Sequence, residues 1–224
     1  MNPAATLGTV LLAYLPAAVS PGPNFVLIAH TAAAGTRRAA VAVALGVVAA
    51  GGVLAAVAVF GLGSVLARAP WLAAGLRVVC GGYLAWLGVR LWLRARTPDA
   101  GEMPDAPEET ANRDEVAAPP RKRAPDAANP NHFRQGVVSN LTNPKAAAFF
   151  GSVLTAALPP TEPTAVKAAA VALILVTSTA WHLSVALLFS APATQRWYAH
   201  AKPALNRVVG TVLVVLGVTL AVTP

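Results

Sequence analysis

Two short stretches of this chain place proline beside small polar residues, in sequence that is otherwise apolar. The first is residues 20–24 (SPGPN), and the second is residues 143–145 (NPK). Proline lacks the N–H that continues a helix, and its ring clashes with the preceding turn. Ser and Asn are favoured N-caps, and Pro is favoured at the first helical position. Both stretches therefore predict a helix that stops and starts again, with free backbone N–H groups at the new start.

These restarts predict a binding site for a small anionic group. The N–H groups at a helix start carry partial positive charge, which attracts anions. Lys145 would add a full positive charge beside the second restart. We expect a carboxylate, such as that of an amino acid, to be bound by the residues around both breaks: Ser20, Pro21, Gly22, Pro23, Asn24, Asn143, Pro144 and Lys145. The alternative is that both prolines only kink packed helices.

Two other polar residues lie in apolar surroundings. His182 follows Thr177, Ser178 and Thr179. Because histidine takes up a proton near neutral pH, His182 is a candidate proton carrier, although a structural hydrogen bond between helices is the alternative. Arg77 lies near the end of a long apolar stretch. It could bind substrate, or it could extend its head group toward water along an apolar surface.

Enzymatic and metal chemistry have no support in the sequence. The chain contains no HExxH or GxSxG motif, and its long apolar stretches contain no acid–base pair. The single cysteine, Cys80, excludes an internal disulfide and a cysteine-based metal cluster. Histidine, aspartate and cysteine do not cluster within the apolar stretches, as a metal site would require. We therefore expect no catalytic residues, no metal and no cofactor.

The elements that position these residues are expected to cross a membrane. Of the 224 residues, 56% are hydrophobic and only 12% are charged, whereas a soluble domain has roughly 25% charged residues. Eight of the nine acidic residues lie between Asp99 and Asp126, and Glu162 is the other. A chain this short would still need a polar surface in water, so much of its surface is expected to face lipid.

Six stretches are long enough to span a bilayer, which takes roughly 20 apolar residues. The first and the fourth are interrupted by proline, so the order is broken, whole, whole, and then the same again. This order predicts an all-α membrane protein with six transmembrane helices. The expected spans are residues 4–34, 39–67, 71–93, 133–158, 164–189 and 203–222.

A segment of different composition separates the first three spans from the last three. Residues 97–131 are rich in Pro, Ala, Asp and Glu and cannot bury enough apolar area to fold. We interpret this segment as a disordered linker. It joins a first three-helix repeat, residues 1–96, to a second three-helix repeat, residues 132–224.

The two halves also share a spacing of glycines. Gly81 and Gly88 in the third expected span are seven residues apart, as are Gly210 and Gly217 in the sixth. Because each half has an odd number of spans, the second half must enter the membrane from the opposite side. Secondary transporters are built from such inverted repeats, and their broken helices mark the binding site.

The placement of basic residues predicts the orientation, because Lys and Arg gather on the cytoplasmic side of membrane proteins. With both termini outside, only Arg68, Arg77 and Lys167 fall on the outer side. No Lys or Arg precedes Arg37, so the first span lacks the charged start of a signal peptide and is expected to be retained. We therefore expect extracytoplasmic termini and a cytoplasmic linker.

Several motifs resemble those of the LysE/RhtB family of amino-acid exporters. Residues 20–25 (SPGPNF) resemble the family's first-span signature, and residues 81–88 (GGYLAWLG) resemble its third. Residues 133–136 (FRQG) and 140–145 (NLTNPK) resemble the start of its fourth. The resemblance covers nearly the whole chain in order. It implies a multi-pass protein of the bacterial inner membrane that exports amino acids with an ion gradient, and it adds Asn140 to the expected substrate-binding residues.

The sequence departs from this family at an informative position. Many members carry Asp where Asn24 stands, and none of the expected spans contains Asp or Glu. A cationic substrate would then lack a counter-charge in a site of low polarity, which is costly. We therefore expect a neutral or small polar amino acid, as in the homoserine/threonine-exporter-like branch.

Other functions stay open at this stage. The chain could export another small solute or an amino-acid analogue, or it could be a non-transporting membrane scaffold. Broken helices argue against a scaffold, because unpaired backbone groups in a membrane are costly without a cavity. Nucleic acid is not an expected partner, since the basic residues flank spans rather than form one patch. The expected partners are a small-molecule amino acid and the lipid bilayer, and a homodimer is one possibility.

Overall fold

The computed structural model describes residues 2–95, 130–158 and 161–222, and every regular element among them is a helix. Residues 97–129 of the expected linker lie outside the described residues. The last two linker residues, Pro130 and Asn131, begin a helix instead. The all-α expectation is therefore confirmed for the described part of the chain.

The first apolar stretch is broken where its prolines lie. Helix α1 (Pro3–Val19) ends at Ser20, and helix α2 (Pro23–Ala34) begins after Gly22. The axes of these two helices differ by 52° at the break. Pro23 is the first residue of α2, where no helical partner exists for the N–H that proline lacks. The predicted restart is confirmed.

The fourth apolar stretch is divided into more pieces than its sequence predicts. Helix α6 (Pro130–Leu141) is followed by α7 (Pro144–Ala148), the π-helix η2 (Phe149–Val153) and α8 (Leu154–Ala157). The Asn143 side chain caps α7 by accepting a hydrogen bond from the Lys145 backbone N–H at 3.0 Å. The predicted restart at Pro144 is thus confirmed, but these pieces do not count as a candidate span.

Four helical segments are long and apolar enough to cross a membrane. Helix α3 (Arg37–Ala56) continues through the π-helix η1 (Val57–Leu62) into the short helix α4 (Gly63–Arg68). The other three are α5 (Pro70–Arg94), α9 (Thr164–Leu188) and α10 (Pro192–Val222). If the bent pair of α1 and α2 is one span, the described residues hold five candidate spans, not the six expected.

Helix α10 begins earlier than the sequence predicts. The expected span starts at residue 203, whereas α10 starts at Pro192 and contains Pro203 in its interior. Residues 195–202 (QRWYAHAK) are too polar to belong to a span, so composition alone excluded them. The helix continues into this polar end because helix formation does not require an apolar environment.

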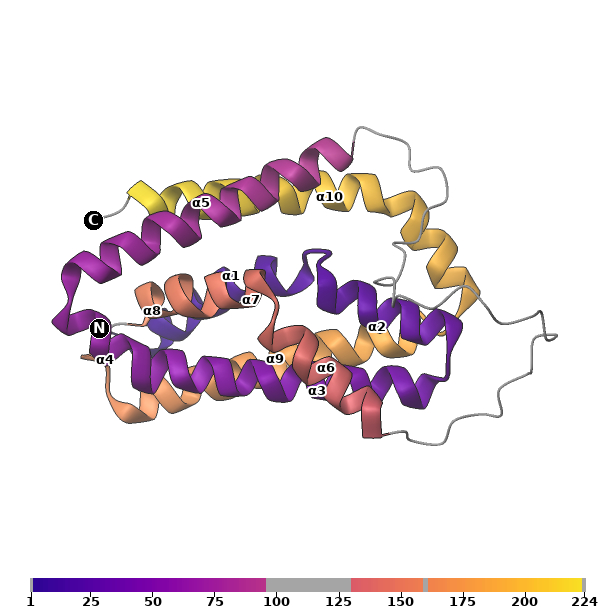
Figure 1. The fold of residues 1–224 in the computed structure, drawn as a ribbon, viewed down its shortest axis with the longest axis horizontal. Coiled ribbons are helices and arrows are strands. Elements are labelled where there is room, and N and C mark those ends of the chain that lie inside the picture. The colour runs from indigo at the N-terminus through magenta and orange to yellow at the C-terminus, as the bar shows by residue number, and fades with distance from the viewer. Residues whose placement is uncertain (1, 96–129, 159–160, 223–224) are drawn as a thin grey trace, which may run out of the picture.

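Helices α5 and α10 run antiparallel along one side of the molecule (Figure 1). Glycines face each other where the two helices meet. A Cβ added to Gly81 would lie 2.5 Å from the Gly217 carbonyl oxygen, and one added to Gly88 would lie 2.5 Å from the Gly210 carbonyl oxygen. Real Cβ atoms essentially never come within 3.0 Å of an atom outside their own residue and its chain neighbours. The glycines that share a spacing in the sequence therefore permit this close packing.

A second pair of glycines holds α6 against α3. A Cβ added to Gly46 on α3 would lie 2.1 Å from the Phe133 carbonyl oxygen. A Cβ added to Gly136 on α6 would likewise lie 2.1 Å from the Val43 carbonyl oxygen. Because α6 leads directly into the break before α7, this contact positions the second break beside α3.

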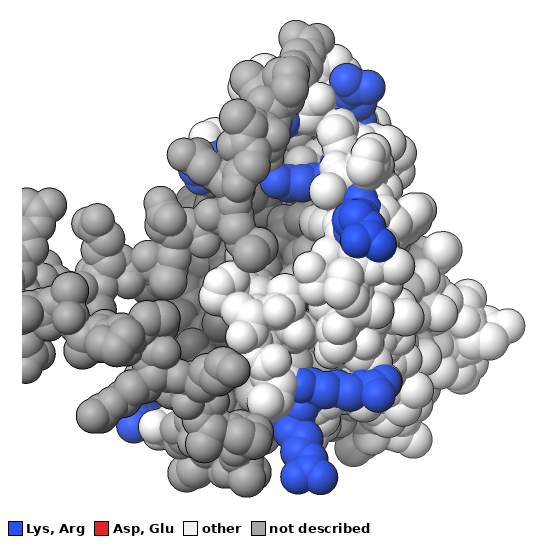
Figure 2. Space-filling view, turned by 90° about the vertical axis from the view of Figure 1, so that its right-hand side faces the viewer, with Lys and Arg blue, Asp and Glu red and all other residues white. Residues whose placement is uncertain are grey.

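The two ends of the molecule differ in the helix ends and basic residues that lie there. Both termini, α4 and α8 lie at one end (Figure 1). At the other end, α3 and α10 begin and α5 finishes, with Arg37, Arg94 and Arg196 exposed at these helix ends. Figure 2 shows Lys and Arg side chains on this face. Large apolar side chains such as Leu12 and Val176 are 73% and 68% exposed, as expected of helices that face lipid.

Candidate substrate site between the broken helices

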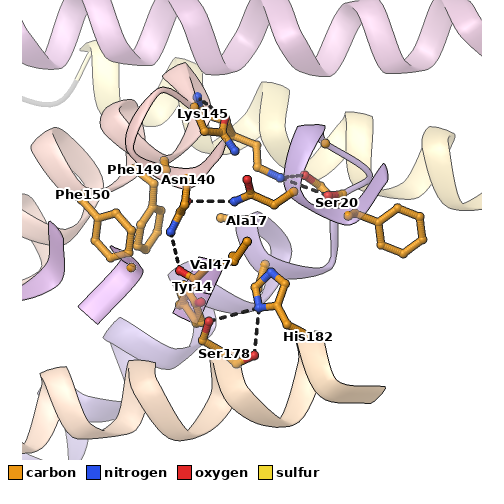
Figure 3. Close-up of a pocket in the computed structure, with 17 residues that line it drawn as sticks. Tyr14, Ala17, Ser20, Val47, Asn140, Lys145, Phe149, Phe150, Ser178 and His182 are labelled. Atoms are coloured by element: carbon orange, nitrogen blue, oxygen red, sulfur yellow. Dashed lines mark hydrogen bonds between the residues drawn. The ribbon is translucent and has the colours of Figure 1, made fainter. Parts of the chain in front are cut away.

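The two helix breaks lie beside each other, with Lys145 of the second pointing to Ser20 of the first (Figure 3). The Lys145 ammonium donates hydrogen bonds to Ser20 Oγ at 2.6 Å and to the Ser20 carbonyl oxygen at 3.0 Å. A Cβ added to Gly22 would lie 3.1 Å from Lys145 Nζ, so only glycine leaves the lysine this much room. The Lys145 ammonium at the second break therefore binds Ser20 at the first break.

A set of amide hydrogen bonds joins the same two segments. Asn24 Nδ2 donates to Asn140 Oδ1 at 2.8 Å, and Ser139 Oγ donates to Asn24 Oδ1 at 2.9 Å. Asn140 Nδ2 donates in turn to the Val47 carbonyl oxygen on α3 at 2.8 Å. These bonds fix which atom of each amide faces which neighbour. They also tie both breaks to α3.

A cavity of about 50 Å³ lies between these groups. Its polar lining comes from both breaks and from Tyr14, Ser178 and His182, and Val47 on α3 and Phe149 and Phe150 on η2 supply apolar walls. This volume is well below the about 150 Å³ of a cavity that binds benzene, so an amino acid does not fit without rearrangement. A larger ligand could enter only if side chains moved. The Lys145 side chain, which crosses from one break to the other, is the natural one to move.

The charge of this site is unbalanced. The lining includes the ammonium of Lys145, but no acidic residue. Among the described residues, the only carboxylate side chain is that of Glu162, which accepts a hydrogen bond from Thr6 Oγ1 at 3.1 Å near the start of α1. An ammonium has three N–H donors, and Ser20 takes two from Lys145. The site can therefore bind an anionic group through the third donor.

His182 on α9 lines the same cavity. Its Nδ1 lies 2.9 Å from the Ser178 carbonyl oxygen and 3.1 Å from Ser178 Oγ. A carbonyl oxygen only accepts hydrogen bonds, so Nδ1 carries the proton and Nε2 is the nitrogen able to accept one. Lys145 lines the same cavity as His182.

The sequence model of the LysE type translocator family matches residues 15–223. The chain belongs to this family. It is also similar to the threonine efflux protein of Escherichia coli (strain K12), with 29% identity over 214 residues that cover 96% of each chain. The threonine efflux protein of Salmonella typhi is 28% identical over the same shares. The uncharacterized membrane protein YahN of E. coli K12 is 26% identical, over 90% of this chain and 82% of its own. No solved structure matches the chain.

Family membership confirms the resemblance seen in the motifs, and the apolar helices make this LysE type translocator a multi-pass membrane protein. Each motif has a structural role in the fold. Residues 20–25 form the first break, and residues 140–145 form the second. Residues 81–88 supply the glycines at which α5 packs on α10.

The structure brings together most of the residues expected to bind substrate in the translocator. Six of them line the central cavity: Ser20, Gly22, Asn24, Asn140, Asn143 and Lys145. The candidate proton carrier His182 lines it as well. Pro21, Pro23 and Pro144 do not line it, and they act on its shape by ending or starting helices. Arg77 lies away from it and lines a second cavity.

Sequence reasoning missed the part of the cavity that comes from unbroken helices. Val47 and Gly51 on α3 and Tyr14 on α1 line it, but an apolar residue in a span carries no signal of its own. Ser178 was recoverable, because it lies one turn before His182 and the same helix face holds both. Phe149 and Phe150 follow the second break directly, so their proximity was also recoverable.

Proposed function

We propose that this protein exports neutral or small polar amino acids from the bacterial cytoplasm across the inner membrane. Its family supports this, as do relatives named threonine efflux proteins that match over 96% of both chains. The observation that carries the proposal is the contact between Lys145 and Ser20, which places one unbalanced cation in a cavity between two broken helices.

The proposed substrate would be held at both of its charged groups. Its carboxylate would accept a hydrogen bond from the third N–H of the Lys145 ammonium, the one that Ser20 does not take. Its ammonium would bind the amide oxygens of Asn24 and Asn140 as their present partners move aside. Because no carboxylate lines the cavity, a basic side chain would stay unpaired, and this disfavours lysine or arginine as substrate.

Export against a gradient needs an ion, and His182 is the proposed carrier of a proton. Its Nε2 can accept a proton while Nδ1 keeps its bond to Ser178. The positive charge formed would then repel the Lys145 ammonium, which lines the same cavity. Proton uptake would thereby release Lys145 from the closed arrangement and couple proton entry to substrate exit.

The proposed architecture is a pair of inverted three-helix repeats, residues 1–96 and 132–224, with six crossings. It is supported by the glycine contacts, because a two-fold rotation that exchanges α5 and α10 converts the pair Gly81–Gly217 into the pair Gly210–Gly88. In this arrangement the basic end of Figure 2 faces the cytoplasm together with the linker, and both termini lie outside.

The function is tested by efflux from cells that express the protein and are loaded with amino acids by feeding dipeptides. We expect faster efflux of threonine or another neutral amino acid from cells with the parent protein, and loss of this gain in Ser20→Ala. Ser184→Ala is the matched control, because Ser184 is exposed and bonds only to its own helix at Ala180. No gain for any amino acid, with the protein present in the membrane, would refute the proposal and favour another solute or a scaffold.

A further inference from the structure

A second cavity lies away from the helix breaks, at the end of the molecule that carries both termini. It measures about 150 Å³, against about 50 Å³ for the central cavity. Its walls are α4, α5, η2 and α8, through residues that include Gly63, Leu66, Leu76, Ser152 and Thr155. An apolar protein cavity of about 150 Å³ is known to hold a benzene molecule, so a small organic ligand fits.

Among the described residues that line this cavity, Arg77 on α5 is the only charged one. No hydrogen bond or ion pair joins its guanidinium to another residue that the structure describes, and the side chain is only partly exposed. Guanidinium groups bind carboxylates through paired N–H donors. Arg68 provides a contrast, because it lies nearby in sequence at the end of α4 but is exposed and outside the lining.

The wall opposite Arg77 offers acceptors. Thr155 Oγ1 donates to the Gly151 and Ser152 carbonyl oxygens at 3.0 Å each, and Ser152 Oγ donates to the Ala148 carbonyl oxygen. Both hydroxyls have used their hydrogen, but each oxygen can still accept a hydrogen bond. An ammonium group could therefore bind on this side while a carboxylate binds Arg77. A guanidinium donor and hydroxyl acceptors in the lining of one small cavity suit a zwitterion.

The π-helix η2 is the wall shared by the two cavities. Phe149 and Phe150 line the central cavity, and Gly151 and Ser152 line the second one. π-Helical turns are often found at functional sites, where one turn is wider than its neighbours. A change in η2 would alter the partition between the cavities without moving the long helices.

We propose that this second cavity is an outer binding site for the amino-acid carboxylate, in which Arg77 receives the substrate after it passes η2 and before its release. The inference rests on the proposed export function. It places the site at the end that holds both termini, which is the outer end in the proposed orientation. It gives Arg77 the role of binding the substrate carboxylate rather than of extending its head group toward water at the membrane surface.

Labelling of an introduced cysteine tests binding at this cavity without relying on transport. In a Cys80→Ser background, Ala156→Cys places a thiol on an exposed position of the lining, and Thr155→Cys is the second position if the first does not fold. Intact cells are treated with a membrane-impermeant thiol reagent, with or without external threonine. A parallel sample contains 1-amino-2-propanol, which is threonine without its carboxylate.

We expect labelling from outside, slowed by threonine and not by the amino alcohol. Arg77→Gln should raise the threonine concentration that protects by about tenfold or more, since it removes a charged hydrogen-bond partner. Arg77→Lys should restore part of the protection, and Arg68→Gln should leave it intact. Labelling only from the inside, no protection by threonine, or full protection in Arg77→Gln would each overturn the proposal.

Efflux measured in the same cells separates this proposal from the function on which it rests. Efflux that persists without threonine protection would refute the outer site alone. Protection that persists without export of any amino acid would refute the export function and leave a site for amino acids.

Discussion

Lys145 Nζ lies 2.6 Å from Ser20 Oγ, although 125 positions in the chain separate the two residues. This bond joins the start of α7, after the second break, to the end of α1, before the first break. Both segments would be expensive to place in a membrane by themselves, because their backbone groups lack helical partners. Their contact supplies those partners and creates the cavity, so the breaks stabilise each other and form the site in one arrangement.

Replacement of the Lys145 cation should affect transport more than folding. We predict that Lys145→Met lowers amino-acid efflux about tenfold or more, because a hydrogen bond to a charged group contributes about 1.5–3 kcal/mol. The protein should still fold in detergent with a lower stability, because the Ser20 carbonyl oxygen loses its partner at a cost of about 1–3 kcal/mol, which is offset in part since methionine fills similar space and removes a charge from an apolar site. Efflux assays and thermal unfolding of the purified protein check both parts. Normal efflux by this variant would contradict the assigned role of Lys145.

The room beside Lys145 can be reduced without changing any polar group. We predict that Gly22→Ala weakens export, because the new Cβ would lie 3.1 Å from Lys145 Nζ, close enough to shift the ammonium by a few tenths of an ångström and weaken its bonds to Ser20. Gly8→Ala on the neighbouring helix α1 is the matched control, since nothing lies within 4 Å of its added Cβ. Equal efflux by the two variants would show that the contact between the breaks does not limit transport.

The substrate preference should depend on Asn24. Asn24→Asp places a carboxylate beside Asn140 and Ser139. In the parent protein the Asn24 amide donates a hydrogen bond to Asn140 and accepts one from Ser139. We predict that efflux of basic amino acids appears or rises, because their side chain gains a counter-charge, while efflux of neutral ones falls. Competition between labelled threonine and unlabelled lysine measures the change. An unaltered preference would mean that selectivity is set elsewhere in the cavity.

The breaks could be predicted from sequence because the chemistry of proline and of N-caps is local. Pro144 and Asn143 act within one helical turn, and the structure places the restart where these residue types predict it. The contact of Lys145 with Ser20 could not be predicted in the same way. It depends on how two distant segments pack, and no spacing in the sequence records that.

The break at Asn143 explains why the predicted fourth span does not appear as one. Residues 144–157 after the break are too short to count as a span, even with the π-helix η2 included. The π-helix by itself does not end a span, because η1 lies within the candidate span Arg37–Leu62. Apolar length in the sequence thus overestimates the length of continuous helix where a cavity interrupts it.

The packing of α5 on α10 should tolerate no side chain at the facing glycines. We predict that Gly88→Ala lowers stability by about 1–3 kcal/mol, the usual cost of overpacking, because its Cβ would lie 2.5 Å from the Gly210 carbonyl oxygen. Gly82→Ala is the control on the same helix, with nothing within 4 Å of its added Cβ. Its effect should stay below about 1 kcal/mol. Unfolding in a detergent series compares the two, and similar stabilities would contradict the close approach of the helices.

Proton coupling can be tested by a residue that keeps the shape of histidine but not its titration. His182→Gln can still donate to the Ser178 carbonyl oxygen, now 2.9 Å from Nδ1, but it cannot carry a proton. We predict that this variant still exchanges labelled for unlabelled amino acid across the membrane and no longer exports against a concentration gradient.

The matched control for this experiment is His200→Gln. The His200 Nδ1 lies 2.7 Å from the Arg196 carbonyl oxygen, the same local bond that His182 makes to the residue four positions before it. His200 is exposed on α10, away from the cavity, so its replacement should leave uphill export unchanged. Uphill export by His182→Gln would exclude His182 as the proton carrier. Because the described part of the central cavity holds no carboxylate, the coupling ion would then have to act at another place.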